Sequence, residues 1–156
     1  MSFININLNQ AEEAKPVVAG FYDLTIAAAE KKFTKENKPQ FRVQIAIDGH
    51  DDAPNVFEYV PSPDPDLDTD KKSLDFKVLL LARFCRLFKI PVSDEGYNPD
   101  DLVQQMVGCT ARAELKVEEY EGNLSNKLVV PRLTEEKGVA GAAGKGSPPK
   151  RVSKAA

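Results

Sequence analysis

A basic segment around one aromatic residue is the first stretch whose residue types could do chemistry. Residues 31–38 place four lysines around a phenylalanine: Lys31, Lys32, Phe33, Lys35 and Lys38. Cations can follow the phosphates of a single-stranded nucleic acid, and aromatic rings can stack on its unpaired bases. More residues of these two kinds follow along the chain: Arg42, Phe57, Tyr59, Arg112, Lys116, Tyr120 and Lys127. Together they predict a surface that binds single strands, whereas the alternative is a set of solvated strand faces with a few core aromatics.

An acidic stretch, residues 61–70, places aspartates at the spacing of calcium ligands. The candidate ligands are Asp64, Asp66, Asp68 and Asp75. A calcium loop needs a glycine at its sixth position, where this chain has Thr69, and Pro65 stiffens the start of the segment. We therefore expect a solvated loop that borders the path of the nucleic acid, with no metal and no cofactor.

Catalytic groups do not form a recognisable set in this sequence. The single histidine, His50, stands in a Gly-His-Asp-Asp turn with no second histidine or partnered cysteine nearby. There is neither a nucleophile motif nor a glycine-rich phosphate loop, and the pair Glu118 and Glu119 lies beside a turn where solvent exposure is the simpler interpretation. The sequence predicts a protein that is not an enzyme.

The elements that must position the basic and aromatic residues are mostly strands. Apolar and polar residues alternate over three early segments, residues 17–29, 41–47 and 56–60, which is the pattern of half-buried strands. The basic segment then becomes the connection between the first two strands. A β-hairpin follows later, with strands over residues 108–118 and 127–133 and a turn at 120–123.

Two helices are predicted between the third strand and this hairpin. Apolar residues recur at helical spacing from residue 71 to residue 88, at Leu74, Val78, Leu81, Cys85 and Phe88. Asp70 or Thr69 can cap the start of this helix, and Pro91 ends it. A second, shorter helix is expected over residues 100–107.

The element order predicts a mainly β protein: a five-stranded OB-fold, which is a Greek-key β-barrel, with a helix between strands three and four. Such a barrel binds its ligand across its second and third strands. On the third strand, buried Val56 and Val60 would leave Phe57 and Tyr59 outside, but a bulge near Glu58 would reverse the faces. The alternation alone therefore does not decide which of Phe57 and Tyr59 faces the ligand.

Charge divides the chain into two parts. The net charge is −3, from 21 basic and 24 acidic residues, but the segment from Gly138 onward has no acidic residue. Its basic residues are Lys145, Lys150, Arg151 and Lys154, so this segment carries +4 and the preceding body −7. We predict an OB-fold domain over residues 1–134 and a flexible, disordered basic tail over residues 135–156, suited to polyanions.

Cysteine usage and hydropathy indicate the compartment. Cys85 and Cys109 have no metal-ligand spacing, and we expect both to be reduced thiols. No apolar run approaches the roughly 18 residues of a membrane span, and no secretory signal is visible. These features predict a cytoplasmic protein without a membrane partner.

Several stretches of the chain resemble a known family. They are residues 19–26, 38–43, 80–88 and 119–122, together with Asn126 and Lys127. In these stretches the sequence resembles the small bacteriophage OB-fold single-stranded-DNA-binding proteins. The resemblance implies an accessory protein of phage DNA replication or recombination, acting in the host cytoplasm. The basic tail departs from the acidic, aromatic-tipped peptide with which bacterial single-strand-binding proteins recruit partners.

We therefore expect sequence-tolerant binding of single-stranded DNA, which protects single strands and presents them to replication or recombination proteins. RNA is an open alternative, because base stacking is indifferent to the 2′-hydroxyl. The alternative from another class is a structural or interaction module of a virion or protein assembly. The oligomeric state is not determined by the sequence.

Overall fold

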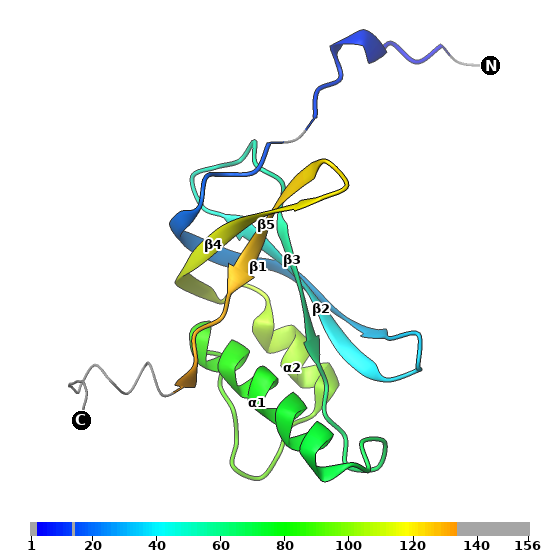
Figure 1. The fold of residues 1–156 in the computed structure, drawn as a ribbon, viewed down its shortest axis with the longest axis vertical. Coiled ribbons are helices and arrows are strands. Elements are labelled where there is room, and N and C mark those ends of the chain that lie inside the picture. Colours follow the sequence, from blue (N-terminus) through cyan, green and yellow to red (C-terminus); the bar gives the residue numbers. More distant parts are fainter. Residues whose placement is uncertain (1–2, 14, 134–156) are drawn as a thin grey trace.

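A five-stranded antiparallel sheet and two helices make up the fold (Figure 1). The computed structural model describes residues 3–13 and 15–133, so the predicted boundary at residue 134 and the tail at 135–156 lie outside the described residues. The strands are β1 (Gly20–Phe33), β2 (Pro39–Ile47), β3 (Val56–Pro61), β4 (Thr110–Tyr120) and β5 (Asn123–Val129). The α-helices are α1 (Lys71–Leu87) and α2 (Pro99–Met106), and a short 3-10 helix, η1 (Leu8–Gln10), precedes the sheet. The mainly β class is confirmed, with the strand order β3-β2-β1-β4-β5.

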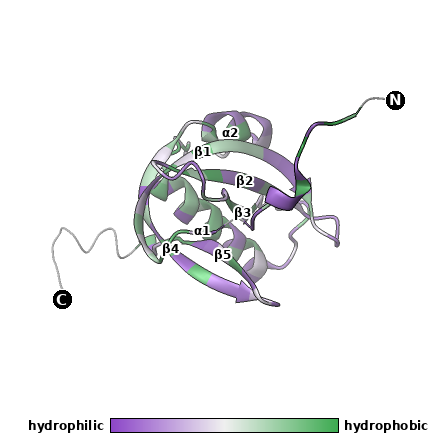
Figure 2. Cartoon of the chain, turned by 90° about the horizontal axis from the view of Figure 1, so that it is seen from above, coloured by the Kyte–Doolittle hydropathy of each residue, from purple (hydrophilic) through white to green (hydrophobic). Residues whose placement is uncertain are grey.

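The core lies on one side of the curved sheet. Alternation on β2 buries Phe41, Val43 and Ile45, and β4 buries Ala113 and Leu115 on the same side. A register shift between Ile26 and Ala28 bends β1. Figure 2 shows the strands curving around a common interior, and the two edge strands, β3 and β5, lie close to each other.

Helix α1 begins where its capping residue predicts. The Asp70 carboxylate accepts a hydrogen bond from the backbone N–H of Ser73 at 3.0 Å. The second half of the predicted apolar stripe is buried, at Leu81, Cys85 and Phe88. In its first half, Leu74 is half-buried and Val78 is 48% exposed. The first turns of α1 are therefore not covered by the core.

The bounds of β1 and β5 differ from the sequence prediction, which placed them at residues 17–29 and 127–133. β1 continues through Phe33, which pairs with Pro39 of β2, so the predicted loop was wrong for residues 31–33. The lysines fit a strand because it is exposed to solvent at this end. β5 begins at residue 123, since Glu121 and Gly122 both adopt positive φ values, 51° and 83°, and close a two-residue hairpin.

Candidate nucleic-acid interface

The outer surface of β1, β2 and β3 gathers charged and aromatic side chains in one place. The register pairs Glu30 with Arg42 and Arg42 with Tyr59 across the three strands. The pairing of β2 with β3 has no bulge, and Phe57 and Tyr59 are 43% and 55% exposed. Both rings therefore lie on the outward side of β3, and the bulge that would have reversed the faces is absent from this pairing. We call Glu30, Lys32, Arg42, Phe57 and Tyr59 the outer face.

Arg42 is the centre of the outer face. Its guanidinium lies 4.3 Å from the centre of the Phe57 ring, and its Nε donates a hydrogen bond to the Tyr59 hydroxyl at 3.3 Å. A guanidinium held on an aromatic ring is attracted by the π electrons and keeps its charge at the surface. The arrangement therefore holds one cation beside two exposed rings, which are the groups that a phosphate and an unpaired base require.

Glu30 supplies a counterion within the outer face. Its carboxylate lies 3.2 Å from the Lys32 ammonium and 3.9 Å from the Arg42 guanidinium. All three side chains are partly exposed, so solvent screens these pairs and a phosphate can compete with the carboxylate. Glu30 thus lowers the positive potential of the outer face but leaves Lys32 and Arg42 accessible to a phosphate.

Strands β4 and β5 carry two more of the predicted cations. Lys116 and Lys127 stand opposite each other in the register, and neither forms an ion pair within the described part of the chain. Like charges in this position repel, which an anion between them would relieve. This part of β5 lies beside β3. Burial raises the pKa of the Glu58 carboxyl above its ordinary value, and the charge of Lys127 offsets part of this rise.

Two other predicted residues of β4 lie apart from Arg42. Tyr120 is exposed at the tip of the β4–β5 hairpin, where its ring is free to stack. The Arg112 guanidinium lies 3.2 Å from the Asp23 carboxylate, on the outer side of β1 and β4. Asp23 and Glu30 are seven residues apart, or about 20 Å along a strand, so the structure does not bring Arg112 to the outer face.

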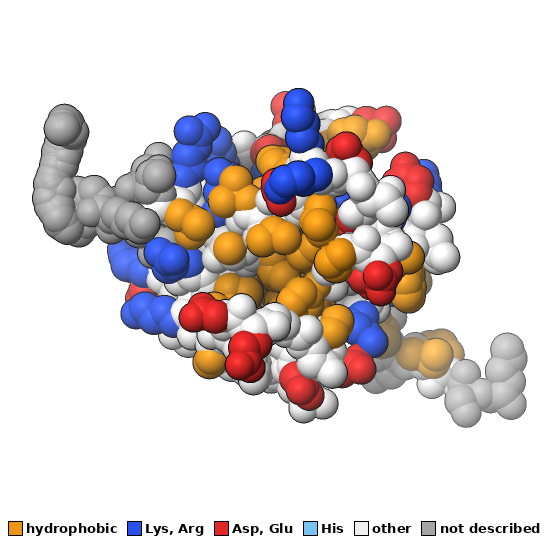
Figure 3. Space-filling model, turned by 90° about the horizontal axis from the view of Figure 1, so that it is seen from below, with side chains coloured by type: hydrophobic (Ala, Val, Ile, Leu, Met, Phe, Trp, Pro, Cys, Tyr) orange, Lys and Arg blue, Asp and Glu red, His pale blue; other side chains and the backbone are white. Residues whose placement is uncertain are grey.

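The basic segment does not form the cluster that its sequence predicts. Alternation on β1 sends Lys32 to the outer face, whereas Lys31 and Phe33 share the opposite side with Phe41. The Lys31 ammonium contacts the Asp100 carboxylate of α2 at 2.5 Å, and Phe33 lines an apolar hollow visible in Figure 3. Lys35 is exposed in the connection. The prediction of four cations around one ring was wrong because three of these residues lie in a strand.

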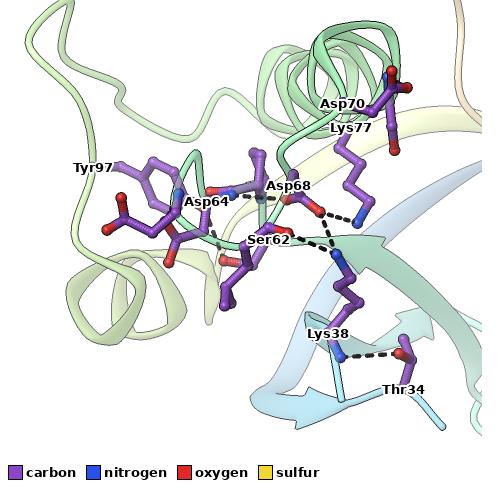
Figure 4. A network of polar contacts seen from close by, with 12 residues as sticks. Thr34, Lys38, Ser62, Asp64, Asp68, Asp70, Lys77 and Tyr97 are labelled. Atoms are coloured by element: carbon purple, nitrogen blue, oxygen red, sulfur yellow. Dashed lines mark hydrogen bonds and ion pairs between the residues drawn. The ribbon is translucent and has the colours of Figure 1, made fainter. Parts of the chain in front are cut away.

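Lys38 is part of a buried polar network (Figure 4). Its ammonium donates to the backbone carbonyl of Leu67 at 2.8 Å and lies 3.4 Å from the Asp68 carboxylate. Asp68, only 4% exposed, also accepts from Lys77 of α1 at 2.6 Å and from the backbone N–H of Asp64 at 3.0 Å. These donors, Lys77 first, hold the pKa of the Asp68 carboxyl below its ordinary value.

The acidic stretch is therefore an ordered loop, and the prediction of a solvated one was wrong for Asp68. The Tyr97 hydroxyl donates to the carbonyl of Pro63 at 2.8 Å and lies 2.8 Å from the Ser62 hydroxyl, which ties residues 91–98 to the same loop. Among the described residues, no group of three or more histidine, cysteine or acidic side chains could hold a metal ion. The carboxylate of Asp68 serves the structure instead.

The cysteines and helices add little to the site. Cys85 and Cys109 are both free thiols, and burial, followed by the charge of Cys109, raises the pKa of the Cys85 thiol to about 11. No helix in the described residues is long and apolar enough to cross a membrane.

The chain matches no protein-family model, and no curated protein matches it.

Proposed function

We propose that this chain is an OB-fold protein that binds single-stranded DNA without reading its sequence. The order β3-β2-β1-β4-β5 supports the fold, since closure between β3 and β5 would give the five-stranded Greek-key barrel. The proximity of β3 and β5 supports that closure, and α1 and α2 follow β3 as the fold requires.

The observation that carries the proposal is the outer face on β1, β2 and β3. An OB-fold binds oligonucleotides across its second and third strands, between the connection of the first two strands and that of the last two. Arg42, Phe57 and Tyr59 occupy this surface, and Tyr120 stands at the second connection. Phosphates would pair with Arg42, Lys32 and Lys127, while bases stack on the exposed rings.

The biological role that follows is non-enzymatic. A protein of this kind coats single strands in the host cytoplasm during phage DNA replication or recombination and presents them to a polymerase or recombinase. Tolerance of sequence follows from the chemistry, because every base has a face that can stack. The acidic excess of the chain, with a net charge of −3, gives double-stranded DNA little general attraction.

A fluorescence titration tests the proposed function. The protein is titrated with oligo-dT, with the matching duplex and with oligo-U in one buffer, since affinities are comparable only at a fixed salt concentration. We expect oligo-dT to bind more tightly than the duplex. Equal affinity for the two DNA ligands contradicts the proposal, and tighter binding of oligo-U moves the ligand from DNA to RNA.

A second function, as an interaction module of a protein assembly, is favoured by a different observation. The hollow lined by Phe33 is apolar and open to solvent, as a surface that packs against protein would be. Arg42 and Tyr59 do not line it, whereas Lys32 of the outer face does, so the two surfaces meet at Lys32.

A further inference from the structure

An apolar groove crosses the end of the molecule at which the helices lie (Figure 3). One part, about 680 Å³, is lined by Phe33, Leu67, Leu74 and Val78 among others. A second part, about 550 Å³, continues along α1 past Cys85 to Val92, and the two parts share Val78 and Tyr97. We call the two parts together the helix-end groove.

The helix-end groove exposes large apolar side chains to solvent, and this exposure does not stabilise a monomer. Phe33, Leu67 and Val78 are large apolar residues with 65%, 45% and 48% of their surface exposed. The Asp68 network and the Tyr97 hydrogen bonds fix the loops that form the groove, so its walls exist before any ligand arrives. A preformed apolar surface of this kind is typical of a binding site for another polypeptide.

A matching apolar segment lies elsewhere on the same chain. Residues 3–11 carry no charge and expose Phe3, Ile4, Ile6 and Leu8, each between 68% and 92% accessible. The base of this arm is held where the Asn126 side chain exchanges two hydrogen bonds of 2.9 Å with the backbone of Val17. Beyond that point the arm extends away from the body, at the end opposite the helices (Figure 1).

We propose that the helix-end groove binds the arm of a second copy of this chain. The arm is uncharged, and most side chains that line the groove are apolar, although Lys31, Lys32, Asp64, Arg86 and Lys89 also line it. The arm therefore brings no charge of its own into the groove. The arm contains one short 3-10 helix, Leu8–Gln10. Its nine residues would span about 30 Å if fully extended, which suits a groove running along α1. Because arm and groove lie at opposite ends, the contact is head-to-tail and leaves a free arm and a free groove for further copies.

This self-association requires no nucleic acid and does not depend on the proposed function. Where that function holds, a chain of copies in one direction matches a continuous coat on a single strand. The prediction is that the full chain associates into more than one copy in the absence of nucleic acid.

Sedimentation velocity without nucleic acid tests the proposal. The arm variant, Ile4→Asn with Ile6→Asn and Leu8→Asn, cannot disturb the body, because no described residue of the body holds these side chains. The groove variant is Val78→Asp, and its matched control is Phe76→Asp on the exposed side of the same helix. Circular dichroism compares the fold of both helix variants with that of the original chain.

We expect the original chain and the Phe76→Asp control to sediment faster as concentration rises, and both other variants to stay at the monomer value. An equimolar mixture of the arm variant and the groove variant retains one intact arm and one intact groove, so it should stop at a dimer. A monomeric original chain, an arm variant that associates as the original does, or a mixture that stays monomeric would each overturn the proposal.

Discussion

Two sets of lysine and arginine side chains lie on opposite sides of the β1–β2 hairpin and have different partners. Around Asp68, the ammonium groups of Lys38 and Lys77 are held by a buried carboxylate and so support the fold. On the outer face, Arg42 and Lys32 share one exposed carboxylate, Glu30, which a phosphate can replace. The burial of the counterion, and not the number of cations, decides which charges are available to a ligand.

The largest expected effect is on the buried side of this comparison. Asp68→Asn should lower the free energy of unfolding by about 2 kcal/mol, because two ammonium groups lose a charged acceptor inside the structure. Chemical denaturation measures this. The matched control is Asp66→Asn in the same loop, whose exposed carboxylate has no such role and whose replacement should change stability by less than about 0.5 kcal/mol.

The same carboxylate predicts how stability depends on pH. The folded-state pKa of Asp68 is lower than its ordinary value of 3.8, so its contribution is complete above that value and is lost as the pH falls through the folded pKa. Denaturation curves from neutral pH to strong acid should show the difference between the original chain and Asp68→Asn shrinking below pH 3.8. A difference that stays constant over this range would mean that the carboxylate is not responsible.

Lys31 and Lys32 are neighbours on β1 but lie on opposite sides of the strand, so their replacement should affect binding differently. Lys32→Ala should weaken binding of all single strands alike and lower the salt-dependence slope by about 0.7, the value of one phosphate contact. Lys31→Ala should leave the slope unchanged, because this side chain faces α2 and pairs with Asp100. Titrations at several salt concentrations measure both slopes, and equal losses would show that alternation on β1 does not separate the two lysines.

The smallest effect expected is a gain. Glu30→Gln removes the carboxylate that competes with phosphate for Lys32 and Arg42, and affinity for oligo-dT should rise about twofold, in keeping with an exposed ion pair. Glu36→Gln, in the connection between β1 and β2, is the matched control. Weaker binding by Glu30→Gln would show that Glu30 orients Arg42 and does not compete with the ligand.

Much of the sheet could be predicted from the sequence, because a half-buried strand has a period of two. Residues 41–47 show that period, and β2 forms there. The C-terminal end of β1 could not be predicted. Residues 31–33 are polar or exposed on both sides, and only their pairing with β2 makes them a strand. The hairpin turn at Glu121 and Gly122 fixes the start of β5, an effect that composition alone did not reveal.

The candidate site was predictable in residue type more than in arrangement. Phe57 and Tyr59 depended on an unbulged register that alternation cannot supply. The burial of Asp68 depends on Lys38, thirty residues before it, and on Lys77, nine residues after it in a helix, and no local pattern links the three. Glu30 was missed because an acidic residue does not suggest a binding site for DNA, although its position two residues before Lys32 places both on one side of a strand.

The affinity of Tyr59→Ala for oligo-dT tests whether the exposed ring of Tyr59 stacks on bases. The ring is exposed and its hydroxyl accepts only one hydrogen bond of 3.3 Å, so the fold should survive its loss. Phe76→Ala, an exposed aromatic residue on α1, is the control. Our account predicts that Tyr59→Ala costs about 1–3 kcal/mol of binding free energy in fluorescence titration while the control binds as the original chain does. Equal affinity of both variants and the original chain would contradict it.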